Sequence, residues 1–180
     1  IFGQINSPKY SNEFLNIGVG ARSLAMSNSV ITSTNSAMSG FWNPANLSRI
    51  NNDIQVGLMH AEYFAGIAKY DFGSIAKKID EKSCFGFSFL RFGVDNIPNT
   101  SELIDAQGNI NYDRISYFSA ADMAFIGSYG RKVNEYLSLG GSAKIINRTA
   151  GDFASAWGFG IDISSTYNKN DWAVAVVAKD

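Results

Sequence analysis

The chain has 180 residues, and its 15 Lys and Arg against 16 Asp and Glu give a formal net charge of −1, so it has no basic field to attract nucleic acid. The single cysteine, Cys84, excludes an intrachain disulfide and a cysteine-rich metal site. Charged residues are only 17% and aromatic residues 13%, with 17 glycines, which is typical of a β-rich protein. The sequence contains no run of about 18 apolar residues, so no transmembrane helix is predicted.

The N-terminal part of the chain shows no regular alternation of apolar and polar side chains. Residues 1–4, IFGQ, are compatible with the tail of a secretory signal peptide. Residues 5–50 are rich in Ser, Asn, Gly and Ala. One short helical turn is predicted over 21–26, and another begins at Pro44, with Asn43 ahead of it as a cap. We therefore expect a small helical and irregular segment here rather than part of a sheet.

From residue 51 onward the pattern alternates with a period of two, which predicts β-strands. We count seven such segments, and several are about 10 to 12 residues long, the length that a tilted strand needs to cross a bilayer. The sixth, WGFGIDISSTY at 157–167, has an aromatic and branched face and a face of Gly, Asp and Ser. The apolar face is expected to meet lipid and the polar face to line a lumen. Five charged residues are predicted to face that lumen: Lys69, Asp71, Lys77, Lys144 and Asp162.

The connections between these segments alternate between two kinds. Three are short and polar, and three are longer. The short ones are 80–83, 131–136 and 168–171, and the longer ones are 60–66, 95–116 and 147–155. In an antiparallel meander all the short turns fall at one end, an asymmetry typical of bacterial outer-membrane barrels. A soluble β-sandwich would show the same alternation, but the loop asymmetry, strand length and low charge favour an all-β, antiparallel up-and-down transmembrane barrel.

Seven is an odd number of strands, whereas bacterial single-chain barrels have an even number. A sheet that does not close would also leave two unpaired edges, which lipid cannot satisfy. We therefore expect residues 51–180 to be the first half of a longer barrel.

Two stretches near the N-terminus resemble a known family. NEFLNIGVGARSLAMSNS at 12–29 and SGFWNPANLSRI at 39–50 are similar to the opening motifs of the PorV/PorQ outer-membrane proteins of the Bacteroidota. The matching residues are Phe14, Leu15, Ile17, Gly18, Gly20, Ala21, Arg22 and Met26 in the first stretch, and Trp42, Asn43, Pro44, Ala45 and Leu47 in the second. Asn46 stands where the family usually has glycine. Later stretches at 56–73 and 92–100 are also similar, so the resemblance covers nearly the whole chain.

The resemblance implies a FadL-like barrel of about fourteen strands with an N-terminal hatch inside the lumen, and seven strands would be half of it. It also implies a role in type IX secretion, in which the protein binds the C-terminal signal domains of secreted cargo or subunits of the translocon. The predicted hatch residues are Gly18, Gly20, Arg22, Trp42, Asn43 and Pro44. The glycines would allow tight bends, and Trp42 would anchor the hatch to the barrel wall.

Arg22 is expected to be a buried cation paired with Asp71 or Asp162, since a buried guanidinium needs such a partner. A clamp on a ligand carboxylate is the alternative. The GVGARS stretch at 18–23 lacks the third glycine and the βαβ context of a dinucleotide site.

His60 is the only histidine, so a Ser-His-Asp triad would have to use it. No nucleophile elbow is present, and a histidine in an outer loop or at a strand end is the preferred interpretation. No enzymatic activity, cofactor or metal site is predicted, and the acidic residues of the 95–116 connection do not have EF-hand spacing.

The 95–116 connection is the candidate contact with a partner, because loops of this length are more often functional than short ones. Its charged residues are Asp95, Glu102, Asp105, Asp113 and Arg114. A self-packed loop that shields the barrel mouth is the alternative.

Two functions follow from these predictions. The first is a plugged outer-membrane barrel, in contact with membrane lipid, that serves type IX secretion through its loops. The second is a FadL-like transporter that moves a hydrophobic small molecule past a mobile hatch. The small and charged residues of the predicted inner face favour the first.

Overall fold

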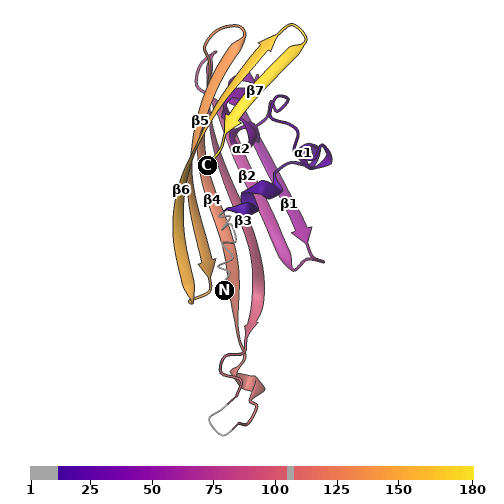
Figure 1. The fold of residues 1–180 in the computed structure, drawn as a ribbon, viewed down its shortest axis with the longest axis vertical. Helices are drawn as coiled ribbons and strands as arrows, with labels where there is room; N and C mark the ends of the chain where they lie inside the picture. The colour runs from indigo at the N-terminus through magenta and orange to yellow at the C-terminus, as the bar shows by residue number, and fades with distance from the viewer. Residues whose placement is uncertain (1–11, 105–107) are drawn as a thin grey trace, which may run out of the picture.

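Seven antiparallel strands form one curled sheet, and the N-terminal segment lies against one face of it (Figure 1). The computed structural model describes residues 12–104 and 108–180. The strands pair in chain order and are β1 (Ile54–Tyr63), β2 (Ala68–Lys78), β3 (Ser83–Asn99), β4 (Ser116–Lys132), β5 (Leu137–Ala150), β6 (Ala154–Lys169) and β7 (Trp172–Ala178). The predicted number of strands and their up-and-down order are confirmed.

Alternation along the strands separates an exposed convex face from a concave face that carries the N-terminal segment. On the convex face, the register sets Leu58 of β1, Phe89 of β3 and Phe159 of β6 in one row across the sheet. Large exposed apolar side chains also project from the other strands on this face. The apolar residues predicted from the alternation lie on the convex face in every strand except β2.

β2 is oriented opposite to the prediction. Its apolar residues Tyr70 and Phe72 are buried on the concave face, whereas Lys69, Asp71 and Lys77 lie on the convex face. The reason is the N-terminal segment, which supplies an apolar surface inside the curl. The hydroxyl of Tyr70 donates to the Phe14 carbonyl oxygen at 3.3 Å, and the Phe72 ring lies 5.9 Å from the Phe41 ring.

The connections differ from the prediction at one end of the sheet. The short turns at 79–82, 133–136 and 170–171 share one end, which we call the short-turn end. At the opposite end, the loop end, only the connection at 100–115 is long. The other two, at 64–67 and 151–153, are short because their strands continue into the segments predicted as loop.

The first short turn is stabilised by one carboxylate. Asp80 accepts hydrogen bonds from the backbone N–H groups of Lys82 and Ser83, at 2.7 and 2.8 Å. The Lys82 bond is the main reason that the pKa of this carboxyl lies below its usual range.

The N-terminal segment consists of short helical pieces joined by loops. They are η1 (Glu13–Ile17), α1 (Ala21–Ala25), α2 (Ser39–Trp42) and η2 (Pro44–Arg49), and η3 (Tyr112–Arg114) lies in the long loop. We call residues 12–50 the hatch; the predicted signal remnant at 1–4 and the start of the predicted 5–50 segment lie outside the described residues. Among the residues described, no helix is long and apolar enough to cross a membrane.

The main hydrophobic core lies between the hatch and the concave face. Phe14, Val19, Phe41 and Trp42 of the hatch pack with side chains of β2 to β5. The contributing sheet residues are Tyr70, Phe72, Leu90, Ala124, Ile126 and Ile146. The hatch is therefore an integral part of the packed structure.

Candidate functional site

The closest approach between hatch and sheet is made by η2, which rests on glycines of β4 and β5. A methyl group added at Gly130 would overlap the Pro44 carbonyl oxygen, and one added at Gly140 would overlap the backbone of Ala45. At Gly86 it would lie 3.1 Å from Leu47 Cδ1. Only residues without a side chain allow the helix to lie this near the strands, so these glycines form a seat for η2.

Hydroxyl groups on the same face satisfy the polar groups of the hatch. The backbone N–H of Ala45 donates to Ser164 Oγ at 2.9 Å, and Ser48 Oγ donates to Ser138 Oγ at 3.1 Å. Ser128 Oγ donates to the Gly40 carbonyl oxygen at 2.9 Å. The first turn of a helix leaves N–H groups without partners, and here the sheet supplies acceptors as well as side-chain caps.

Asn43 links three parts of this interface. Its Oδ1 caps η2 by accepting the Ala45 N–H at 3.1 Å, as predicted for a residue ahead of Pro44. Its Nδ2 donates to Thr166 Oγ1 of β6 at 2.8 Å and to the Ile31 carbonyl oxygen at 2.7 Å. Asn43 is completely buried, so one side chain holds together the helix, the sheet and the hatch loop.

Asn46 and Trp42 complete the fixation of the hatch. Asn46, which stands at the position where the resembling family has glycine, also donates to the Ile31 carbonyl oxygen, at 3.0 Å. Its peptide is helical, so no glycine is needed there. Trp42 is buried and donates its indole N–H to the Val19 carbonyl oxygen at 2.9 Å.

Two glycines of the hatch have backbone angles that favour glycine. Gly18 has φ +90° and Gly20 has φ +92°, in the region that side chains rarely adopt. A methyl group at Gly18 would come within 2.8 Å of the Trp42 ring, and one at Gly20 within 2.8 Å of Met38 Sδ. The GVG stretch thus forms a tight bend packed against α2.

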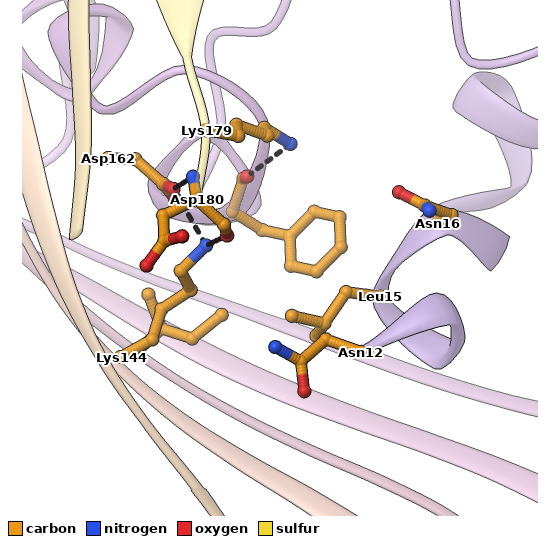
Figure 2. A pocket seen from close by; sticks show the side chains of 9 residues that line it. Asn12, Leu15, Asn16, Lys144, Asp162, Lys179 and Asp180 are labelled. Carbon is orange, nitrogen blue, oxygen red and sulfur yellow. Dashed lines mark hydrogen bonds and ion pairs between the residues drawn. The ribbon is translucent and has the colours of Figure 1, made fainter. Parts of the chain in front are cut away.

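A buried ion pair lies beside the hatch on the concave face (Figure 2). Lys144 Nζ of β5 is 2.7 Å from Asp162 Oδ1 of β6, and both side chains are about 5% exposed or less. Ser142 Oγ donates to the second oxygen of Asp162 at 3.0 Å. Lys144 also donates to the carbonyl oxygen of Asp180 at 2.7 Å, so both charges are satisfied.

Lys179, the neighbour of Asp180 in the chain, contacts the hatch beside this ion pair. Its Nζ donates to the Phe41 carbonyl oxygen at 3.3 Å and lies 5.0 Å from the centre of the Phe41 ring and 5.1 Å from that of Trp42. The cavity between the groups in Figure 2 is about 190 Å³ and is bordered by Leu15 as well as these residues. Such a volume holds a few water molecules, not a drug-sized ligand.

Arg22 is not the buried cation that was predicted. It is exposed, and in the described part of the chain it makes no ion pair with Asp71, Asp162 or another carboxylate. Asp162 is already paired with Lys144, and Asp71 lies on the convex face, so neither can reach it.

The charged residues of β2 take part in contacts on the convex face. Asp71 Oδ1 lies 2.6 Å from Nδ1 of His60, whose Nε2 faces Glu62 at 3.5 Å. Lys69 lies 3.9 Å from Asp95, and Lys77 is exposed. Nε2 of His60 thus faces a carboxylate rather than a hydroxyl, an arrangement that lacks the nucleophile of a Ser-His-Asp triad.

The predicted contact residues of the long loop do not gather into one cluster. Asp95 accepts from Arg91 at 2.7 Å in the half of β3 nearer the loop end. Glu102, Asp113 and Arg114 are exposed near the tip, and Asp105 lies outside the described residues. Within 12–104 and 108–180, no group of acidic, histidine or cysteine side chains is arranged to hold a metal ion.

The seat on the sheet was not predicted residue by residue. Gly130, Gly140, Ser164 and Thr166 appear in the sequence as ordinary members of alternating strands. The signal that they share is the concentration of Gly, Ser and Thr on one face of three neighbouring strands, which indicates that backbone approaches that face.

Comparison with protein families gives a match over nearly the whole chain. The model of a family described as "Type IX secretion system protein PorV" matches residues 6–177. That range includes the hatch and nearly all of the sheet. The search of curated proteins returns no match.

Proposed function

Because the chain belongs to the PorV family of type IX secretion system proteins, we propose that it is an outer-membrane β-barrel protein that binds secreted cargo or translocon subunits through the loop end of its sheet. A role in type IX secretion follows from the family. The partner contact, the membrane location and the absence of enzymatic activity are the parts that we propose.

The observation that carries the proposal is the β3–β4 hairpin. It continues beyond its neighbours and ends in the long loop, which extends farthest from the rest of the molecule (Figure 1). Ile104, Ile110 and Tyr112 of this loop are all exposed. Exposed apolar side chains on a projecting element favour contact with another protein.

The convex face supports a location in the outer membrane. Apolar side chains cover its middle, for example Val56, Ile75 and Phe87 in one row. On β2 this apolar region is bounded by Lys77 near the short-turn end and by Asp71 near the loop end. Charged side chains are costly at the centre of a bilayer and much less so near its interfaces, so this order suits a membrane-spanning wall.

The hatch makes transport through the lumen the less favoured function. A transporter of hydrophobic molecules needs a path past the hatch, but here the concave face meets η2 through buried hydrogen bonds and glycine contacts. Moving η2 would break several buried hydrogen bonds together, each worth about 0.5–1.5 kcal/mol net. We therefore propose that the hatch is a fixed plug.

The test is capture of partners by the full-length protein, tagged in the 133–136 turn, from detergent-solubilised outer membranes. Recovery of translocon subunits or cargo C-terminal signal domains is expected. A variant with Glu102→Lys and Asp113→Lys should reduce this recovery, because both carboxylates are exposed on the projecting loop.

Glu81→Lys is the control for charge reversal, since Glu81 is also exposed but lies in a short turn at the opposite end. It should leave recovery unchanged. Recovery of the protein alone, with a co-purified fatty acid or other hydrophobic molecule, would contradict the proposal and support transport.

A further inference from the structure

We propose that the free edge of β4 over Ser116–Ser119 receives an extended strand of a cargo C-terminal signal domain, which adds to the sheet beside the hairpin. This inference rests on the proposed function and names its mode of contact.

Toward the loop end, the β3–β4 hairpin extends past the strands on either side of it. Ile97 pairs with Phe118 and Asn99 with Ser116, so the two strands remain paired up to the loop. The last pair between β2 and β3 is Ala68 with Val94, and the last between β4 and β5 is Ala120 with Ala150. Both outer edges of the hairpin are therefore without a strand partner, as its projection in Figure 1 illustrates.

The β3 edge is poorly suited to accept a strand. Pro98 lies opposite Tyr117 and has no N–H to offer on the outer side. The register also shifts between Val94 and Ile97, and Asn96 within this shift has φ +59°. A proline and a bulge are features by which natural sheets block edge pairing.

The β4 edge has neither feature. Ser116–Ser119 reads SYFS, without proline, glycine or charge. The Ser119 carbonyl oxygen accepts the Gly151 N–H at 2.8 Å and so points toward the β5 side. Since backbone groups alternate along a strand, the N–H and C=O of Tyr117 point to the same side, beyond the loop end of β5, where they are available to another strand.

Aromatic side chains flank this edge on both faces of the sheet. Tyr117 is 67% exposed on one face. On the other, the rings of Phe118 and Phe153 meet edge to face with centres 5.1 Å apart, and Phe153 is 64% exposed. An added strand with alternating apolar side chains would bury both surfaces while its backbone pairs with Tyr117.

The charged residues around the β4 edge indicate which kind of added strand would fit there. Glu102, Asp113 and Asp152 are exposed around this edge, Arg114 lies in the same loop as the first two, and the exposed Arg148 is already paired with Asp122. The excess of acid favours an extended segment that carries Lys or Arg beside its apolar positions.

The test uses the full-length protein in detergent, a purified C-terminal signal domain of a type IX cargo as the probe, and two substitutions at one position. Tyr117→Pro removes the outward N–H without breaking the β3–β4 ladder, because Pro98 already lies at the opposing position. It should weaken binding by about tenfold or more. Tyr117→Ala keeps the N–H and should weaken binding by less, about threefold.

Hydrogen–deuterium exchange gives a direct readout of the backbone. In the unsubstituted protein, binding of the probe should slow exchange at the Tyr117 amide by about tenfold or more. Unchanged exchange elsewhere in β4 of the Tyr117→Pro variant shows that the variant is folded.

Two results would overturn the inference in different ways. Equal binding by the unsubstituted protein and Tyr117→Pro, with an unprotected Tyr117 amide, would exclude strand addition and leave the proposed function intact. No binding of the signal domain by the unsubstituted protein would contradict cargo binding itself, and the strand addition with it.

Discussion

Two ion pairs on the concave face, both involving β5, have contrasting surroundings. Lys144 and Asp162 meet at 2.7 Å beside the hatch, with side chains 4% and 5% exposed. Arg148 and Asp122 meet nearer the loop end, with side chains 51% and 19% exposed. The same strand thus carries one pair in a protein interior and one in contact with solvent, because Asp180 and the hatch lie over the first pair.

The same division holds for backbone hydrogen bonds. Beneath the hatch, the N–H of Ala45 and the carbonyl oxygen of Gly40 have partners on the sheet. At the loop end, the outer backbone groups of Tyr117 have no strand beside them. Beneath the hatch the backbone groups stabilise the fold, whereas at the loop end of β4 they are available to a partner. This distribution is expected of a barrel that is closed by a plug and binds partners at its loop end.

The largest expected effect comes from unbalancing the covered ion pair. Asp162→Leu leaves the buried Lys144 ammonium without its carboxylate and should lower the free energy of unfolding by about 3–5 kcal/mol. Urea unfolding of the full-length protein, followed by tryptophan fluorescence, measures the change. Adding Lys144→Met removes the unpaired charge and should recover most of the loss. A loss below about 1 kcal/mol in the single variant would show that solvent reaches this region.

The next largest loss of stability is expected at the glycines on which η2 rests. Gly140→Ala places a methyl group against the backbone of Ala45. Because neither β5 nor η2 can move away without breaking its own contacts, we expect the free energy of unfolding to fall by about 3 kcal/mol in the same assay. Gly127→Ala in β4 is the matched control, because a methyl group there meets nothing within 4 Å. If both variants unfolded alike, the close seating of η2 would be wrong.

Sequence patterns predicted the sheet better than they predicted what covers it. Period-two alternation gave seven strands, and in six of them the apolar face is the convex one. It failed for β2, because alternation shows that a face is apolar but not which apolar environment it meets. Tyr70 and Phe72 meet the hatch rather than the outside.

The hatch residues show the same limit. Asn43 was predicted as a helix cap from its position before Pro44, a local rule, and it is one. Its bond to Thr166, far away in sequence, has no local signal. The burial predicted for Arg22 depended on a long-range partner, and the available carboxylates are engaged elsewhere.

Asn43→Ala tests the polar part of the seat and should have a moderate effect. It removes donors to Thr166 Oγ1 and to the Ile31 carbonyl oxygen from a fully buried site. The Ile31 carbonyl oxygen keeps its bond from Asn46, but loss of the Thr166 partner and of the η2 cap should cost about 2 kcal/mol of unfolding free energy. Asn35→Ala in the exposed hatch loop is the control and should change stability by less than about 0.5 kcal/mol. Equal effects would mean that the bonds of Asn43 add nothing to the packing around it.

The smallest effect is expected for the ion pair at the loop end, and it completes the comparison. Arg148→Met removes the guanidinium that contacts both oxygens of Asp122. Because water can reach this pair, the free energy of unfolding should fall by no more than about 1 kcal/mol. Because a solvated pair is screened, about 0.5 M salt should remove most of this difference while leaving that of Asp162→Leu. A salt-independent loss of several kcal/mol would place Arg148 in a covered interior like that of Lys144, and the loop end of the concave face would then be part of the plug rather than an open rim.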